Sequence, residues 1–164
     1  MKETRATDST RAIDSCRRQV LRVAVGAGAG AVLAGMSHPA LATAAELRAA
    51  IANFTAGAAA QPGRVTLDVA PLVENGNSVP ITISVQSPMT ATDHVTAIAV
   101  FNEGNPQRDV AVFRLGPRAG RAVVATRIRL ATSQQLVAVA QLSDGTFWSS
   151  TADVIVTLAA CVES

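Results

Sequence analysis

The chain has 164 residues, of which 49% are hydrophobic, so it is long enough for one globular domain with a hydrophobic core. Only 3% of the residues are aromatic, so that core must consist mainly of Val, Ile, Leu and Ala. The formal net charge is only +2, which lacks the marked positive excess typical of proteins that bind nucleic acid and argues against such a partner.

Residues 16–42 show the order of parts that is typical of an export signal. Arg17 and Arg18 precede a weakly apolar, glycine-diluted stretch of 14 residues, 23–36. This stretch is shorter than the ~20 residues that cross a bilayer, which favours a signal peptide over a transmembrane anchor. The paired arginines and the Gln-Val-Leu after them resemble the twin-arginine (Tat) signal. We therefore expect a periplasmic mature protein without a membrane segment.

Small residues at Ala40 and Ala42 form the A-x-A pattern that a signal peptidase recognises, so we expect cleavage after Ala42, with Ala44 as the second candidate. The predicted signal, 1–42, contains six of the 14 Lys/Arg and three of the 12 Asp/Glu. The mature chain then keeps 8 basic and 9 acidic residues and a net charge of −1. Removal of the signal thus strengthens the argument against a nucleic-acid partner.

A short helix is predicted at about residues 44–55. The sequence TAAE at 43–46 has the spacing of a capping box, and Leu47, Ile51 and Phe54 recur at helical intervals. The small-residue connector AGAAAQPG follows.

Beyond the connector the hydrophobic period changes to two, as in Val65, Leu67 and Val69. Strand-like runs lie at 64–69, 79–86, 94–101, 109–114, 121–130, 134–142, 146–150 and 153–158. Turn residues separate several of them, at 74–77, 104–106, 116–117 and 143–145. This pattern predicts an all-β fold, an antiparallel immunoglobulin-like β-sandwich with a short N-terminal helix, after a cleaved signal peptide. The domain would span 43–158, followed by a tail at 159–164.

The sequence offers little for catalysis. His94, beside Asp93, is the one histidine beyond the signal, and a single His with a distant Cys cannot build an ordinary metal site. We interpret Asp93 and His94 as the start of a strand. A G-x-S-x-G elbow and a phosphate-binding loop are absent, and the run GAGAGA lies inside the signal. We therefore expect no enzyme activity, no cofactor and no metal.

Five arginines cluster in the stretch FRLGPRAGRAVVATRIRL: Arg114, Arg118, Arg121, Arg127 and Arg129. Exposed charge is the default for such residues, so a solvated strand face is the favoured interpretation. A patch for an anion or a protein partner is the alternative.

Cys161 is the most informative residue of the chain. Cys16 lies in the predicted signal, so Cys161 would be the only thiol of the mature protein. An odd cysteine in an exported protein indicates a free reactive thiol or an intermolecular disulfide. Cysteines are often buried, but a chain end is generally exposed, which argues against a structural role.

Three long segments resemble the SoxY family: VENGNSVPITISVQSPM (73–89), NPQRDVAVFRLGPRAGRAVVATRIRLA (105–131) and LVAVAQLSDGTFW (136–148). The Tat-like signal and the string IANFTAGAA extend the resemblance over most of the chain. The resemblance implies an immunoglobulin-like carrier in thiosulfate oxidation that pairs with a SoxZ subunit and crosses the membrane folded. It also implies a substrate-carrying cysteine in a terminal GGCGG, which maps by position to Cys161. Separate haem, manganese and molybdenum enzymes would act on the bound sulfur.

The end of the chain departs from that pattern. Ala159 and Ala160 precede Cys161, and Val162, Glu163 and Ser164 follow it. Alanine and β-branched valine are stiffer and wider than glycine, and Glu163 adds negative charge that disfavours a thiolate. Two interpretations stay open: a carrier of thiosulfate-derived sulfur, or a divergent paralogue that acts as a periplasmic binding or structural partner without sulfur carriage.

Overall fold

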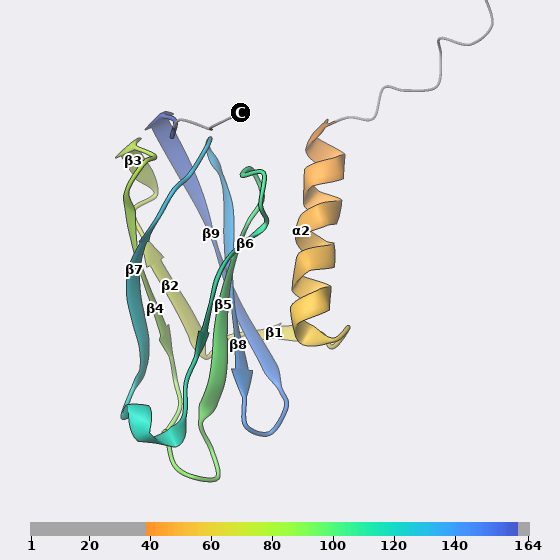
Figure 1. Ribbon diagram of the computed structural model, residues 1–164, viewed down its shortest axis with the longest axis vertical. Helices are drawn as coiled ribbons and strands as arrows, with labels where there is room; N and C mark the ends of the chain where they lie inside the picture. The colour runs from red at the N-terminus through yellow and green to blue at the C-terminus, as the bar shows by residue number, and fades with distance from the viewer. Residues whose placement is uncertain (1–38, 161–164) are drawn as a thin grey trace, which may run out of the picture. The chain divides into compact units, whose positions relative to one another are not determined.

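The computed structural model describes residues 39–160, which form one helix followed by nine strands (Figure 1). The helix is α2 (Pro39–Thr55). The strands are β1 (Ala60–Pro62), β2 (Val65–Val69), β3 (Leu72–Asn75), β4 (Val79–Val85), β5 (Val95–Asn102), β6 (Asp109–Arg114), β7 (Ala122–Ile128), β8 (Gln134–Leu142) and β9 (Phe147–Leu158), with a 3-10 turn η1 (Pro117–Ala119) between β6 and β7.

Two sheets pack face to face. The larger has the order β1-β9-β8-β5-β6, with β3 also paired to β9, and the smaller has the order β2-β4-β7. Strands pair antiparallel except for β1 and β3, which both run parallel to β9. The predicted fold class, a β-sandwich with an N-terminal helix, is confirmed.

Most strands follow the predicted alternation. Six of the predicted runs coincide with β2, β4, β5, β6, β7 and β8. The runs at 146–150 and 153–158 form one continuous strand, β9, because residues 147–154 pair with β8 without interruption. The short strands β1 and β3 were not predicted.

Helix α2 lies along the outer face of the larger sheet (Figure 1). Its Leu47 is buried and Phe54 is half-buried, and both pack in a cluster with Phe101 of β5 and Phe147 of β9. The ring of Phe54 meets each of these two phenylalanine rings edge-on at 6.0 Å. These contacts give the molecule a second core outside the sandwich.

The helix is longer than predicted. It begins at Pro39, so the 43–46 segment lies inside it and the predicted capping box is wrong. Glu46 instead forms an ion pair with Arg108 in the loop after β5. At the other end, Gly57 has a φ of 83° and its amide donates to the Ala52 carbonyl at 2.8 Å, which stops the helix. No helix among the described residues is long and apolar enough to cross a membrane.

The main core lies between the two sheets and consists of aliphatic side chains, as the composition predicted. It includes Ile81 and Ile83 of β4, Ile98 of β5 and Leu136 of β8.

In the turn between β8 and β9, the Asp144 carboxylate accepts hydrogen bonds from the side chain and backbone of Thr146, which lowers the pKa of Asp144. This turn lies at the end of the sandwich opposite the carboxyl end of β9.

Candidate functional site

The residue with the clearest chemistry, Cys161, lies just outside the described residues, as do Arg17 and Arg18 of the predicted signal. Ala40 and Ala42 fall in the first turn of α2, so cleavage after Ala42 would remove that turn. The last described residue is Ala160, which directly precedes Cys161 and is 7% exposed. The contacts of Ala160 therefore define the candidate site.

Three backbone segments meet at Ala160. The Ala160 amide donates to the Leu130 carbonyl at 3.1 Å, and the Leu130 amide donates to the Gly76 carbonyl at 2.8 Å. The Gly76 amide in turn donates to the Leu158 carbonyl at 2.8 Å. We call this set of three hydrogen bonds the C-terminal clasp. It joins the end of β9 to the turn before β4 and to the connection between β7 and β8.

The clasp requires glycine at position 76. A Cβ atom added there would overlap the Leu130 carbonyl oxygen and would lie 2.9 Å from the Ala160 nitrogen and 3.1 Å from a methyl group of Val156. Two of these neighbours are backbone atoms that cannot rotate away. Gly76 is thus a residue of close backbone approach, whereas the sequence had indicated only a turn.

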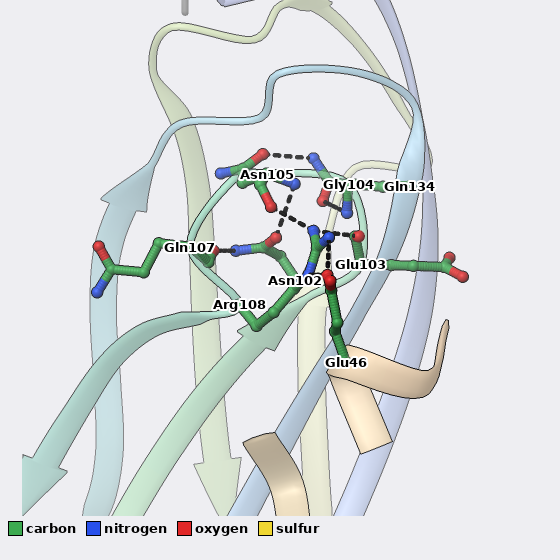
Figure 2. A network of polar contacts seen from close by, with 8 residues as sticks. All are labelled: Glu46, Asn102, Glu103, Gly104, Asn105, Gln107, Arg108 and Gln134. Carbon is green, nitrogen blue, oxygen red and sulfur yellow. Dashed lines mark hydrogen bonds and ion pairs between the residues drawn. The ribbon is translucent and has the colours of Figure 1, made fainter. Parts of the chain in front are cut away.

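Leu130 is held rigidly, because its side chain is fully buried in the core between the sheets. Asn105 braces the residues on both sides of it: its Nδ2 donates to the Arg129 carbonyl at 2.8 Å, and its Oδ1 accepts from the Ala131 amide at 2.9 Å. Gln134 also donates to Asn105 Oδ1, at 2.8 Å (Figure 2). The segment that holds Ala160 is therefore fixed by both apolar and polar contacts.

Hydrogen bonds from buried amide side chains also stabilise the loop between β5 and β6. Asn102 accepts from the Asn105 amide at 2.9 Å and donates to the Gln107 carbonyl at 2.8 Å, while Gln134 accepts from the Gly104 amide at 2.6 Å. Asn102 and Gln134 are both buried, so these bonds satisfy amide groups that would otherwise be costly to bury.

Arg108 closes this network and links it to α2 (Figure 2). Its guanidinium donates to the Glu103 carbonyl at 2.5 Å, to the Asn105 carbonyl, and to the Glu46 carboxylate through Nε at 3.0 Å. The side chain of Arg108 is 14% exposed, but that of Glu46 is 60% exposed.

We expect Arg108→Ala to lower the free energy of unfolding by about 2–3 kcal/mol, because two loop carbonyls lose a charged donor. Glu46→Gln should cost no more than about 1 kcal/mol, because an exposed ion pair contributes little. Urea unfolding of the two variants measures both values. Equal losses would show that the ion pair, and not the loop carbonyls, accounts for the role of Arg108.

Among the described residues, the surface around the clasp lacks a catalytic cluster. Leu158 at the end of β9 is 63% exposed. The cross-strand neighbours Leu72 and Ile155 are 57% and 59% exposed and lie on the other face of β9, because side chains alternate along a strand. Among residues 39–160, no three His, Cys, Asp or Glu side chains lie close enough together to hold a metal ion.

His94 is not brought to this surface. It directly precedes β5, as predicted, and its backbone exchanges hydrogen bonds with Ser143. The whole length of β5, about 25 Å, separates it from Asn102 at the clasp end. The five clustered arginines are all exposed, in agreement with a solvated surface.

A hollow of about 230 Å³ lies between α2 and the strands β5 and β6. It is lined by Ala50, Asn53, Phe54, Phe101, Asp109 and Val112. With one carboxylate and one amide among apolar side chains, it offers no nucleophile or paired acid and base.

Comparison with known proteins shows which family the chain resembles. The family model described as "Sulfur oxidation protein SoxY" matches residues 51–161, a range that ends at Cys161. No curated protein sequence matches the chain significantly. Among solved structures, the sulfur carrier protein SoxY from Chlorobium limicola f thiosulfatophilum is 28% identical, with a TM-score of 0.59 over 69% of this chain and 93% of that one.

Two superoxide reductases share the fold alone. One, a neelaredoxin from Ignicoccus hospitalis, is 18% identical with a TM-score of 0.51 over 56% of this chain and 78% of its own. The other, described as a putative superoxide reductase from Thermotoga maritima, is 20% identical with a TM-score of 0.50 over 63% of this chain and 89% of its own. Because the SoxY model covers more than half of the sequence and the SoxY carrier shares the fold, the chain belongs to the SoxY family.

Proposed function

We propose that this protein is a covalent sulfur carrier in sulfur oxidation, in which the thiol of Cys161 holds a thiosulfate-derived group while separate enzymes act on it. The observation that supports this most directly is the family match, which runs through the clasp to Cys161 as its last residue. The solved SoxY relative is itself described as a sulfur carrier protein. The chain would act with enzymes and not as one.

On this chain, the attachment of sulfur requires only the thiol of Cys161. Coupling Cys161 to thiosulfate forms one S–S bond and gives Cys–S–S–SO₃⁻, with release of one proton and of two electrons to a redox partner enzyme. The same adduct forms without a separate oxidant from tetrathionate, because the thiolate attacks one inner sulfur and thiosulfate leaves. Tetrathionate is therefore a suitable reagent for loading the protein in the test tube.

A discharge experiment tests the proposal. The protein loaded with tetrathionate is mixed with extract from cells grown with or without thiosulfate, and the adduct on Cys161 is followed by mass spectrometry. The control is a loaded peptide of residues 157–164, which has the same thiol but lacks the folded domain. We expect the extract of thiosulfate-grown cells to discharge the protein at least about tenfold faster than the peptide, because enzymes must recognise the carrier. Equal rates with protein and peptide would contradict the proposal.

The altered tail supports a second candidate. Ala160 is buried and hydrogen-bonded, where the family resemblance implies a glycine before the cysteine. A divergent paralogue that serves as a periplasmic binding or structural partner, without sulfur carriage, would leave Cys161 unloaded in cells. Replacing Cys161 would then leave thiosulfate oxidation by the cells unchanged.

Export and partnership are part of the same proposal. The protein would cross the membrane folded through the Tat pathway, together with a SoxZ-like subunit that has no signal of its own. Replacing Arg17 and Arg18 by lysine should remove both proteins from the periplasmic fraction, because the partner enters only with this chain. Cell fractionation and immunoblotting measure this. A periplasmic partner in the absence of exported carrier would contradict the shared route.

A further inference from the structure

The carboxyl end of β9 does not lead directly into a free tail. Leu158 is the last residue of the strand, but the clasp engages the chain again two residues later, at Ala160. Ala160 is also packed, with 7% of its side chain exposed. The segment between the strand and Cys161 is thus held at both of its ends.

We propose that Gly76 and Leu130 are positioning residues that hold Ala160, so that the chain is fixed up to the residue directly before Cys161. The use of this arrangement in sulfur transfer rests on the proposed function. The arrangement itself rests on the contacts of Gly76, Leu130 and Ala160.

The clasp shortens the reach of the thiol. A chain that left the sandwich at Leu158 could carry the Cα atom of residue 161 about 10 Å from the strand end. Because Ala160 is held, the Cα atom of residue 161 can lie only one residue, about 3.8 Å, from the fixed Cα atom of Ala160. A partner enzyme would therefore have to bring its reactive centre close to this end of the sandwich.

The clasp is rigid for reasons that are independent of the tail. The Leu130 carbonyl that accepts from Ala160 belongs to a fully buried residue, and Asn105 holds the residues on either side of it. At Gly76, an added Cβ atom would overlap the Leu130 carbonyl oxygen and would crowd the Ala160 nitrogen. Because Leu130 is anchored by its fully buried side chain, we expect a change at Gly76 to release Ala160 and not Leu130.

The experiment uses the full chain with Cys16→Ser, so that Cys161 is its only thiol. Gly76→Ala is compared with Gly116→Ala, where an added Cβ meets no atom within 4 Å and the backbone is extended. Amide hydrogen exchange reports the clasp directly. We expect the Ala160 amide to be protected in the parent protein and in Gly116→Ala, and to lose protection at least about tenfold in Gly76→Ala. Exchange of the parent Ala160 amide at the rate of a free peptide would overturn the proposal.

A steric measurement separates positioning from thiol chemistry. Cys161 is labelled with maleimide–biotin reagents of increasing spacer length, and the shortest spacer that allows capture by streptavidin is recorded. The parent and Gly116→Ala should need a longer spacer than Gly76→Ala and than a variant with two glycines inserted between Ala160 and Cys161. The rate of reaction with iodoacetamide should stay within about twofold in all four. Capture of the parent at the same spacer as the insertion variant would overturn the proposal.

If Gly76→Ala does not fold, Ala160→Pro removes the amide donor without adding an atom at Gly76, and should shorten the required spacer in the same way. If Ala160→Pro needs the same minimum spacer length as the parent, the proposed positioning role of the clasp is contradicted. Neither readout depends on sulfur loading. The proposed carrier function can therefore fail while the clasp is confirmed, and the reverse also holds.

Discussion

We expect Cys161→Ser to abolish the thiosulfate oxidation in which we propose that this protein acts, and to leave its free energy of unfolding within about 0.5 kcal/mol of the parent value. Serine keeps the size and polarity of the side chain but cannot form an S–S bond, so no sulfur can be held. Stability is expected to persist because position 161 follows the last strand and the clasp, both of which stay intact.

The measurement is thiosulfate consumption by cells that lack the native gene and express the variant. The matched control is Cys16→Ser, which removes the other cysteine of the chain and keeps Cys161. Thiosulfate consumption should be lost with the first variant and retained with the second. Normal consumption with Cys161→Ser would favour the binding or structural partner over the carrier.

Phe101→Ala should have the largest effect on stability, a loss of about 3–5 kcal/mol in the free energy of unfolding. The Phe101 side chain is 2% exposed and fills the interface between α2 and the larger sheet, where it meets Phe54 edge-on. Its removal leaves a cavity that the rigid sheet cannot close. Because small domains are stable by only about 5–15 kcal/mol, such a loss would be easily measured.

Urea unfolding followed by circular dichroism measures this loss. Val112→Ala is the matched control, since Val112 lines the same hollow but is 47% exposed, and its truncation should cost less than about 1 kcal/mol. A loss for Phe101→Ala as small as that of the control would show that α2 does not pack on the sheet as described.

The sequence predicted the parts of the fold that bury an alternating face. Strands such as β4 and β8 carry apolar residues on the core side, and this period is visible without knowledge of their neighbours. Strands β1 and β3 contain three and four residues, and their pairing with β9 decides their conformation. No local pattern of apolar residues predicts such edge strands. The predicted capping box was wrong because α2 begins at Pro39, before the 43–46 segment, and Glu46 pairs with Arg108, 62 residues away.

At the candidate site, the position of Cys161 and the family resemblance predict that this residue carries the substrate, and the sequence placed Gly76 in a turn. It could not predict that Gly76 lies against Leu130 and Ala160, because these residues come from three segments far apart in the chain. The glycine of an Asn-Gly turn is a common local signal. Its close backbone contacts depend on the tertiary fold alone.

The most direct test of sulfur carriage is the intact mass of the protein isolated, without reductant, from cells supplied with thiosulfate. We expect a fraction of the molecules to carry a thiosulfonate group or additional sulfur atoms, mapped to Cys161 and removed by reductant. A free thiol in all molecules, or only glutathione adducts and disulfide-linked dimers, would contradict a carrier function for Cys161.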